Sequence, residues 1–154
     1  MLAELCRELN NWFDEKPDGT SDRHFGTFVI ENGSIDLSGT GIRDGQHFRI
    51  VGSVLNDGVY RYPAQSLSDE TFDGAVWLMR VPLEVINLST DIMAWQEKYG
   101  AADSAAMSPF QSESFGGYSY TKASGSSADG AGSAAPTWQS VFRGRLNVWR
   151  KIRP

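Results

Sequence analysis

The stretch TFVIENGSIDL, residues 27–37, sets the fold class of this chain. Asn32-Gly33 separates the hydrophobic run Phe28-Val29-Ile30 from the alternating stretch at residues 34–37, and these two residues tolerate the positive φ that a tight type I′ turn requires. The stretch therefore predicts an antiparallel β-hairpin. The same period of two extends from Phe25 to Val81, so we expect roughly four to six short strands in a small antiparallel sheet or partial barrel. Further turn signals punctuate it: Asp44-Gly45, Asn56-Asp57-Gly58 and Asp73-Gly74.

Helical periodicity flanks this β-region. Residues 2–13 place hydrophobic side chains at spacings of three and four, which predicts an amphipathic N-terminal helix ending before Lys16-Pro17. A central helix is expected after Pro82, because proline lacks an N–H that would have no partner in the first turn. Its hydrophobic stripe continues to Tyr99, and Gly100 is a suitable C-terminal cap.

Residues 101–136 differ from the rest in composition, since Ala, Ser and Gly dominate. Such a segment has little to bury, and we interpret it as a long extended arm. The arm contains aromatic residues between positions 110 and 120 that a plain linker does not need. Pairing with another strand or subunit would bury them.

After the arm, hydrophobic residues from Trp138 to Ile152 recur at helical spacing and predict one basic, amphipathic C-terminal helix. The expected organisation is therefore α+β. Residues 1–100 form a core of helix, β-module and central helix, residues 101–136 form the arm, and residues 137–154 form a docking helix.

Composition places the chain among soluble globular proteins, with 154 residues, 40% hydrophobic and 21% charged. No hydrophobic run approaches the roughly 20 residues that span a bilayer, so we expect no membrane partner. The N-terminus lacks the basic start and continuous apolar stretch of a signal peptide. The single cysteine, Cys6, excludes an intramolecular disulfide, and its spacing among leucines predicts a buried position.

Charge is distributed unevenly along the chain. Residues 137–154 contain five cations and no acidic residue. Because the whole chain has a net charge of −5, residues 1–136 carry −10. This split favours docking of the basic tail onto an acidic surface, such as that of a neighbouring copy, or contact with phosphate. The acidic body disfavours sequence-specific binding of duplex DNA.

The residues of catalytic and metal sites do not form a recognisable pattern. The only imidazoles, His24 and His47, lie on predicted strands without a nucleophile motif. Two histidines and one cysteine make no zinc set, and the acidic groups at 56–57 and 69–73 lack the register of a calcium loop. The glycine-rich turns lack the lysine of a P-loop. We expect a protein that is not an enzyme and has no cofactor or metal.

Two segments of the chain, residues 52–82 and residues 111–120, resemble segments of known proteins. Residues 52–60, followed by residues 71–78 and Val81-Pro82, are similar to a β-module of phage structural proteins. QSESFGGYSY, residues 111–120, resembles the SES-x-G-x-YS stretch that lies between helices in head–tail connector proteins. Connectors are chiefly helical, whereas this chain has a predicted β-module between its first two helices. Its level in the neck therefore stays open between adaptor, stopper and another minor virion or tail protein.

The resemblance implies a ring-forming adaptor of about twelve copies that joins the portal to the tail or a stopper protein. It would be made in the host bacterial cytoplasm, would lie in the neck of the virion, and would come near packaged DNA without specific contact. Implied interface residues on the arm are Phe110, Ser112, Glu113, Ser114, Phe115, Tyr118 and Tyr120. Those on the C-terminal helix are Trp138, Phe142, Arg143, Arg145, Trp149 and Arg150.

An alternative is a ligand-binding β-module, for example for carbohydrate. Tyr60, Tyr62 and Trp77 could form its stacking platform, although strand alternation makes some of them core residues instead. This alternative requires the aromatic side chains to be exposed on one face of the sheet. An assembly subunit would instead expose hydrophobic surface on its arm and terminal helix.

Overall fold

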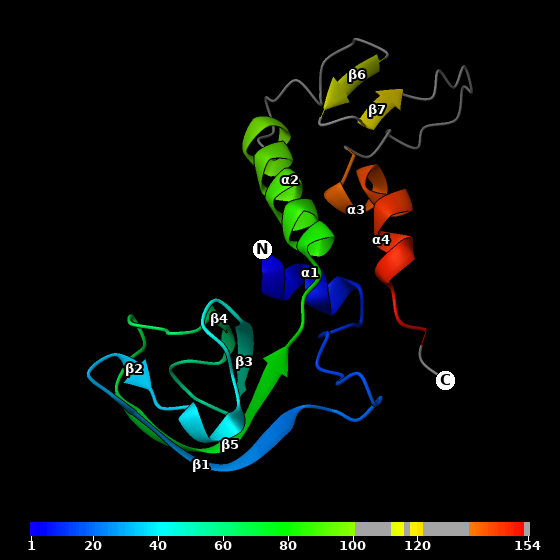
Figure 1. Ribbon diagram of the computed structural model, residues 1–154. Helices are drawn as coiled ribbons and strands as arrows, with labels where there is room; N and C mark the ends of the chain where they lie inside the picture. Colours follow the sequence, from blue (N-terminus) through cyan, green and yellow to red (C-terminus); the bar gives the residue numbers. More distant parts are fainter. Residues whose placement is uncertain (101–111, 116–117, 122–135, 153–154) are drawn as a thin grey trace. The chain divides into compact units, whose positions relative to one another are not determined.

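The computed structural model describes residues 1–100, 112–115, 118–121 and 136–152 and has the expected α+β composition (Figure 1). The chain divides into two compact units. One contains Leu2–Leu83 with the residues from Lys151 onward, and the other contains Glu84–Arg150 with Met1. The first unit holds the sheet and the second holds the long central helix.

The N-terminal helix, α1, spans Leu2–Glu8, so the prediction of a helix through residue 13 was wrong. Asn10 and Phe13 adopt left-handed conformations with φ of 50° and 52°. A right-handed helix requires negative φ, so it cannot continue through these residues. The N–H of Phe13 is bonded to the side-chain oxygen of Asn11 (3.1 Å), a local bond that competes with the helical pattern. Cys6 is buried, as predicted.

Five antiparallel strands form a curled sheet, which confirms the predicted small sheet or partial barrel. Their order in space is β2-β1-β5-β3-β4. The strands are β1 (Arg23–Glu31), β2 (Ser34–Ile35), β3 (His47–Val51), β4 (Gly58–Arg61) and β5 (Glu70–Met79), and a short 3₁₀ turn, η1 (Ser38–Thr40), follows β2. His24 and His47 lie on β1 and β3, as expected.

The turn at Asn32-Gly33 is confirmed, with φ of 52° and 75°, and it pairs Ile30 with Ile35. The turn signal at Asp73-Gly74 was misleading, because both residues lie inside β5. Gly74 pairs with Gly26 of β1, and a Cβ at Gly74 would lie 2.2 Å from the carbonyl oxygen of Val51. Gly74 therefore allows the neighbouring backbones to approach closely. Figure 1 shows that both β1 and β5 are bent along their length.

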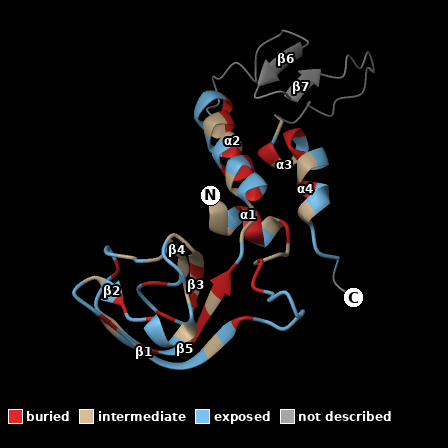
Figure 2. Cartoon of the chain, viewed as in Figure 1, coloured by how far each residue is buried: buried red, intermediate tan, exposed pale blue. Residues whose placement is uncertain are grey.

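One face of the sheet carries the hydrophobic core of the first unit. Phe48 pairs with Leu78 and Ile50 pairs with Val76, and all four side chains are buried. This alternation of inward and outward residues agrees with the predicted period of two. Figure 2 shows buried residues interspersed with exposed ones along the strands. The core also includes Ile30, Ile35, Leu37, Leu67 and Phe72.

The opposite face carries a row of stacked cationic and aromatic side chains. Trp77 pairs with Arg23 on one side and Arg49 on the other. The guanidinium carbon of Arg23 lies 4.0 Å from the Trp77 ring centroid, and that of Arg49 lies 3.6 Å from Trp12. These cation–π contacts cover part of the outer face, so Trp77 is half-buried although it points away from the core.

In the second unit, α2 spans Leu83–Tyr99 after Pro82, which confirms the predicted central helix. The N–H of Gly100 bonds to the carbonyl of Gln96 (2.8 Å) at its C-terminal end. The buried stripe is the predicted one, with Val85, Leu88, Ile92, Trp95 and Tyr99. None of the helices in the described part of the chain is long and apolar enough to cross a membrane.

The predicted single C-terminal helix is two helices, α3 (Trp138–Val141) and α4 (Arg143–Trp149). Phe142, with φ −95° and ψ 10°, separates them, and its buried side chain fixes the junction. Thr137 begins α3 with a capping box that it shares with Ser140. The prediction of a helix through Ile152 was wrong, because Arg150 is extended and Ile152 is 91% exposed.

The arm contains two short strands, β6 (Ser112–Phe115) and β7 (Tyr118–Thr121), which pair antiparallel as a separate two-stranded sheet. Phe115 pairs with Tyr118, and Ser114 pairs with Ser119. The two halves of the QSESFGGYSY segment are therefore paired with each other. The predicted interface residue Phe110 lies outside the described residues.

Candidate functional site

The connection between β3 and β4, residues 52–57, presents two hydrophobic side chains to solvent. Val54 is 89% exposed and Leu55 is 61% exposed. Single exposed hydrophobic residues are common, but two adjacent ones at the tip of an ordered loop indicate a contact surface. We call residues 52–57 the apolar loop.

The carboxylate of Glu70, the first residue of β5, holds the apolar loop. It accepts hydrogen bonds from the backbone N–H groups of Val54 (2.9 Å) and Leu55 (3.3 Å). It also accepts bonds from the Ser53 hydroxyl and the Asn56 side-chain amide. One carboxylate therefore receives a hydrogen bond from each of four consecutive loop residues, and the side chains of Val54 and Leu55 stay exposed.

Asn56 joins this network to the chain before β5. Its side chain donates to the carbonyl of Ser68 (2.9 Å) and accepts from the N–H of Ser68 (2.8 Å). Its own N–H bonds to the Ser53 hydroxyl (2.6 Å). Because Asn56 is buried and its side-chain amide is paired on both ends, the loop has one defined conformation.

The pKa of Glu70 is lowered, chiefly by the hydrogen bond from the Ser53 hydroxyl. Desolvation acts in the opposite direction, and the bonds from Val54, Leu55 and Asn56 lower the pKa further. Glu70 is therefore ionised at neutral pH, and its hydrogen bonds are charge-assisted. The arrangement is suited to a rigid contact with another macromolecule, because the loop has little conformational entropy left to lose on binding.

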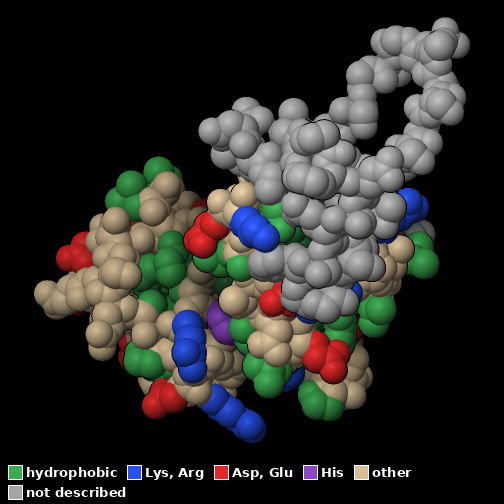
Figure 3. Space-filling view, turned by 90° about the horizontal axis from the view of Figure 1, so that it is seen from above, with side chains coloured by type: hydrophobic (Ala, Val, Ile, Leu, Met, Phe, Trp, Pro, Cys, Tyr) green, Lys and Arg blue, Asp and Glu red, His purple; other side chains and the backbone are tan. Residues whose placement is uncertain are grey.

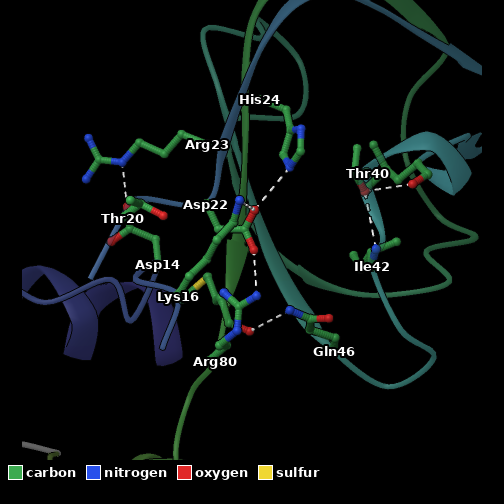
Figure 4. A network of polar contacts seen from close by, with 12 residues as sticks. Asp14, Lys16, Thr20, Asp22, Arg23, His24, Thr40, Ile42, Gln46 and Arg80 are labelled. Atoms are coloured by element: carbon green, nitrogen blue, oxygen red, sulfur yellow. Dashed lines mark hydrogen bonds and ion pairs between the residues drawn. The ribbon is translucent and has the colours of Figure 1, made fainter. Parts of the chain in front are cut away.

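A second polar network surrounds Asp22 (Figure 4). Its buried carboxylate accepts a bond from the Arg80 guanidinium (2.7 Å) and contacts His24 (3.2 Å) and Lys16 (3.6 Å). Burial alone would raise the pKa of Asp22, but the hydrogen bond and charge of Arg80 outweigh it and lower the pKa. Backbone bonds run alongside, from the N–H of Leu78 to Asp22 and from the N–H of Arg80 to Phe13. This network fastens residues 13–24 to the end of β5.

The six predicted interface residues of the C-terminal helix have different environments. Trp138 and Phe142 are buried within the chain itself, 5% and 1% exposed, so in this conformation they do not form a docking surface. Arg145 bonds to Asp91 of α2 (2.7 Å). Trp149 is half-buried, whereas Arg143 and Arg150 are exposed.

The predicted interface residues of the arm lie mainly on the paired strands. Ser112, Glu113, Ser114 and Phe115 are on β6, and Tyr118 and Tyr120 are on β7. The strands thus bring six of the seven proposed arm residues together in one hairpin. The exposed hydrophobic residues outside the arm include Val148 and Ile152 near the C-terminus.

The aromatic platform of the ligand-binding alternative is not assembled. Tyr60 and Tyr62 contact Phe48, with ring centroids 5.8 and 6.4 Å apart, and pack against the core. Trp77 lies on the opposite face of the sheet, since it neighbours Leu78, which shares the face of Phe48. The three rings therefore do not share a binding surface.

Sequence analysis missed the role of Glu70, which it considered only among the acidic residues at 69–73 that do not match a calcium loop. A signal existed in the hairpin connection itself, where Val54-Leu55 interrupts a run of turn formers that would ordinarily be polar. Such an interruption indicates a loop that displays its hydrophobic residues. It does not identify the carboxylate that holds them, because Glu70 is 15 positions away from Leu55.

Within the described ranges no three His, Cys, Asp or Glu side chains are grouped so that they could hold a metal ion. Charged side chains of both signs are interspersed with hydrophobic ones on the face shown in Figure 3. No family model, curated protein or solved structure matches the chain.

Proposed function

We propose that this protein is a structural subunit of the neck of a tailed bacteriophage, a ring-forming head–tail connector that joins the portal to the tail. The observation that carries the proposal is the QSESFGGYSY segment, which resembles the connector motif and coincides with β6 and β7. A segment rich in aromatic residues and folded as a hairpin on a Ser/Gly-rich arm is suited to contact a neighbouring subunit.

The apolar loop supports an assembly role independently of that resemblance. Glu70 and Asn56 fix the loop, and Val54 and Leu55 project from it into solvent. A preorganised apolar tip suits burial in a protein contact, because little ordering is required on binding. In a ring every contact is repeated by symmetry, so a small tip of this kind contributes once per subunit.

In this proposal the chain has no catalytic residue and needs no cofactor. Its partners are further copies of itself, the portal, and a tail or stopper protein, and its place is the neck of the virion. It would lie near packaged DNA without reading its sequence.

The mass of the purified protein in solution, measured by light scattering with and without portal, tests the proposal. We expect a ring of about twelve subunits, formed alone or on the portal. A protein that is monomeric alone and is not recruited by portal would refute the connector role.

Two variants separate the contributions of loop and hairpin. Replacing both Val54 and Leu55 with Ser removes the apolar tip and keeps the bonds to Glu70, which come from the backbone. Replacing residues 112–121 with a Gly/Ser segment of equal length removes the hairpin. Both should weaken assembly. The matched control is Leu83→Ser together with Met93→Ser, which replaces two exposed hydrophobic residues of α2 and should leave assembly unchanged.

A further inference from the structure

β1 has an open edge. On one side it is paired with β5, but on the other side β2 pairs only with Ile30 and Glu31. At the start of the strand, the bond from the Asp22 N–H to the Asp14 carbonyl (2.6 Å) closes this edge. Between these points, no described segment pairs with residues 23–29 along the free side of β1, which forms the margin of the sheet in Figure 1.

The open edge has few of the features that prevent edge-to-edge pairing. Natural edge strands are commonly short or carry charged side chains, above all lysine, or proline. Residues 23–29 form a long run without lysine or proline, and the arginine in it, Arg23, lies at the start of the run and stacks on Trp77. The outward row includes Phe25, 76% exposed, and Val29, 48% exposed, with exposed Thr27 between them. The other edge strand, β4, has only four residues.

The β6–β7 hairpin has unpaired edges of its own, which could pair with the open edge of β1. It is a two-stranded sheet that pairs with no other described strand. Isolated two-stranded hairpins are marginally stable in water, and a third strand is what usually makes them persist. Each of its strands has four residues, which fits within the seven open residues of β1.

We infer that the β6–β7 hairpin of one copy adds to the open edge of β1 in a neighbouring copy, so that the five-stranded sheet continues across the subunit contact. Backbone hydrogen bonds would supply the binding, and the exposed row of Phe25, Thr27 and Val29 would gain cross-strand neighbours. The inference rests on the proposed function, because a ring places one surface of each copy against a different surface of the next.

Disulfide cross-linking between two full-length variants tests the inference. One carries Thr27→Cys on β1, and the other carries Ser114→Cys or Ser119→Cys. These two serines pair with each other, so one of them lies on the hairpin strand nearer to β1. The control is Thr71→Cys, which is exposed on β5 and is separated from the open edge by its pairing partner on β1, Val29. The native Cys6 can stay, because burial raises its pKa to about 12 and suppresses its thiolate.

We expect the mixture of Thr27→Cys with one hairpin variant to give at least about tenfold more cross-linked dimer than the mixture with Thr71→Cys. Three results would overturn the inference. The first is no cross-link above the control, and the second is preferential cross-linking between two copies of the Thr27→Cys variant. The third comes from a double variant that carries both cysteines in one chain and is diluted with wild type: a cross-link within that single chain. The last two indicate that β1 pairs with itself or with its own hairpin.

Light scattering on the same samples separates this inference from the proposed function. A ring without the specific cross-link would leave the connector role intact and remove the β1 contact. As a second variant, Phe25→Asp should weaken assembly at least about tenfold, while Val148→Asp, at another exposed hydrophobic residue, should not. Equal effects of the two would also overturn the inference.

Discussion

Glu70 and Asp22 organise two parts of the same sheet with different kinds of donors. Glu70 receives neutral donors, a hydroxyl, a side-chain amide and two backbone N–H groups, all from one short loop. Asp22 contacts the cationic groups of Arg80 and Lys16, together with His24, which come from three separate segments. The first network defines the shape of a loop, whereas the second ties distant segments together.

This difference separates local order from global stability. Loss of the Glu70 carboxylate removes bonds within a surface connection that displays Val54 and Leu55. Loss of the Asp22 carboxylate leaves Arg80 without its buried partner and loosens the attachment of residues 13–24 to β5. The two acids should therefore respond differently to substitution, pH and salt.

The largest effect is expected from Asp22→Asn. This change removes a buried charge that pairs with Arg80 and should lower the free energy of unfolding by about 2 kcal/mol, a value reduced because the Arg80 side chain is partly exposed. Urea denaturation measures it. The control is Asp18→Asn, where an exposed acid bonds only to Thr20. Equal destabilisation by both variants would contradict the assigned role of Asp22.

Glu70→Gln should loosen the apolar loop and change global stability less than Asp22→Asn does. The amide of Gln offers one acceptor in place of two and points an NH₂ group at donors. Hydrogen exchange at the N–H groups of Val54 and Leu55 should accelerate about tenfold. Asp69→Asn is the control, because Asp69 bonds to Gly33 and not to the loop. Unchanged exchange in the Glu70 variant would disprove the anchoring role.

Acid should weaken both networks in the same direction. The pKa values of Asp22 and Glu70 are lowered in the folded state, so both acids contribute stability that is complete above the unfolded carboxyl pKa, near 4. That contribution is lost as pH falls through the folded pKa values. The steep fall of the urea midpoint should lie below about pH 4. A smaller decline is expected between about pH 7 and 5, because burial and the charge of Arg61 lower the pKa of His47 in the folded state. Asp22→Asn should show a shallower fall, and a slope identical to wild type would refute its share.

Salt should produce the smallest difference between the two networks. The Arg80 and Lys16 side chains are partly exposed, so about 1 M NaCl should screen their attraction to Asp22 and cost a few tenths of a kcal/mol. The neutral donors of the apolar loop should keep its amide exchange unchanged. Faster exchange at Val54 and Leu55 in salt would erase the distinction drawn between the networks.

The parts of the fold that sequence predicts well are those fixed by local chemistry. Asn32-Gly33 makes its hairpin because both residues accept positive φ, and α2 follows its stripe from Val85 to Tyr99 after Pro82. The end of α1 and the break at Phe142 were missed. They depend on backbone conformations at single residues that hydrophobic periodicity does not report.

Asp73-Gly74 shows a different limit. The dipeptide is a strong turn signal, yet the glycine is needed because the carbonyl of Val51 comes close in the folded sheet. Tertiary contact decides its role, and a single sequence does not contain that contact. The same limit hid Glu70, whose partners lie across a hairpin. The arm residues could be proposed as an interface from the sequence because their motif is contiguous, and that assignment stays a prediction.

The pairing of Gly26 with Gly74 has a mechanical consequence. At this step of the ladder between β1 and β5, neither strand has a side chain, so tension along the strands is carried there by backbone hydrogen bonds alone. Neighbouring steps also have side-chain contacts, such as the bond between Thr27 and Asp73 and the stacked rings of Phe28 and Phe72. A pulling force should therefore separate the two strands first at the glycine pair. The sheet should also bend most easily at this step.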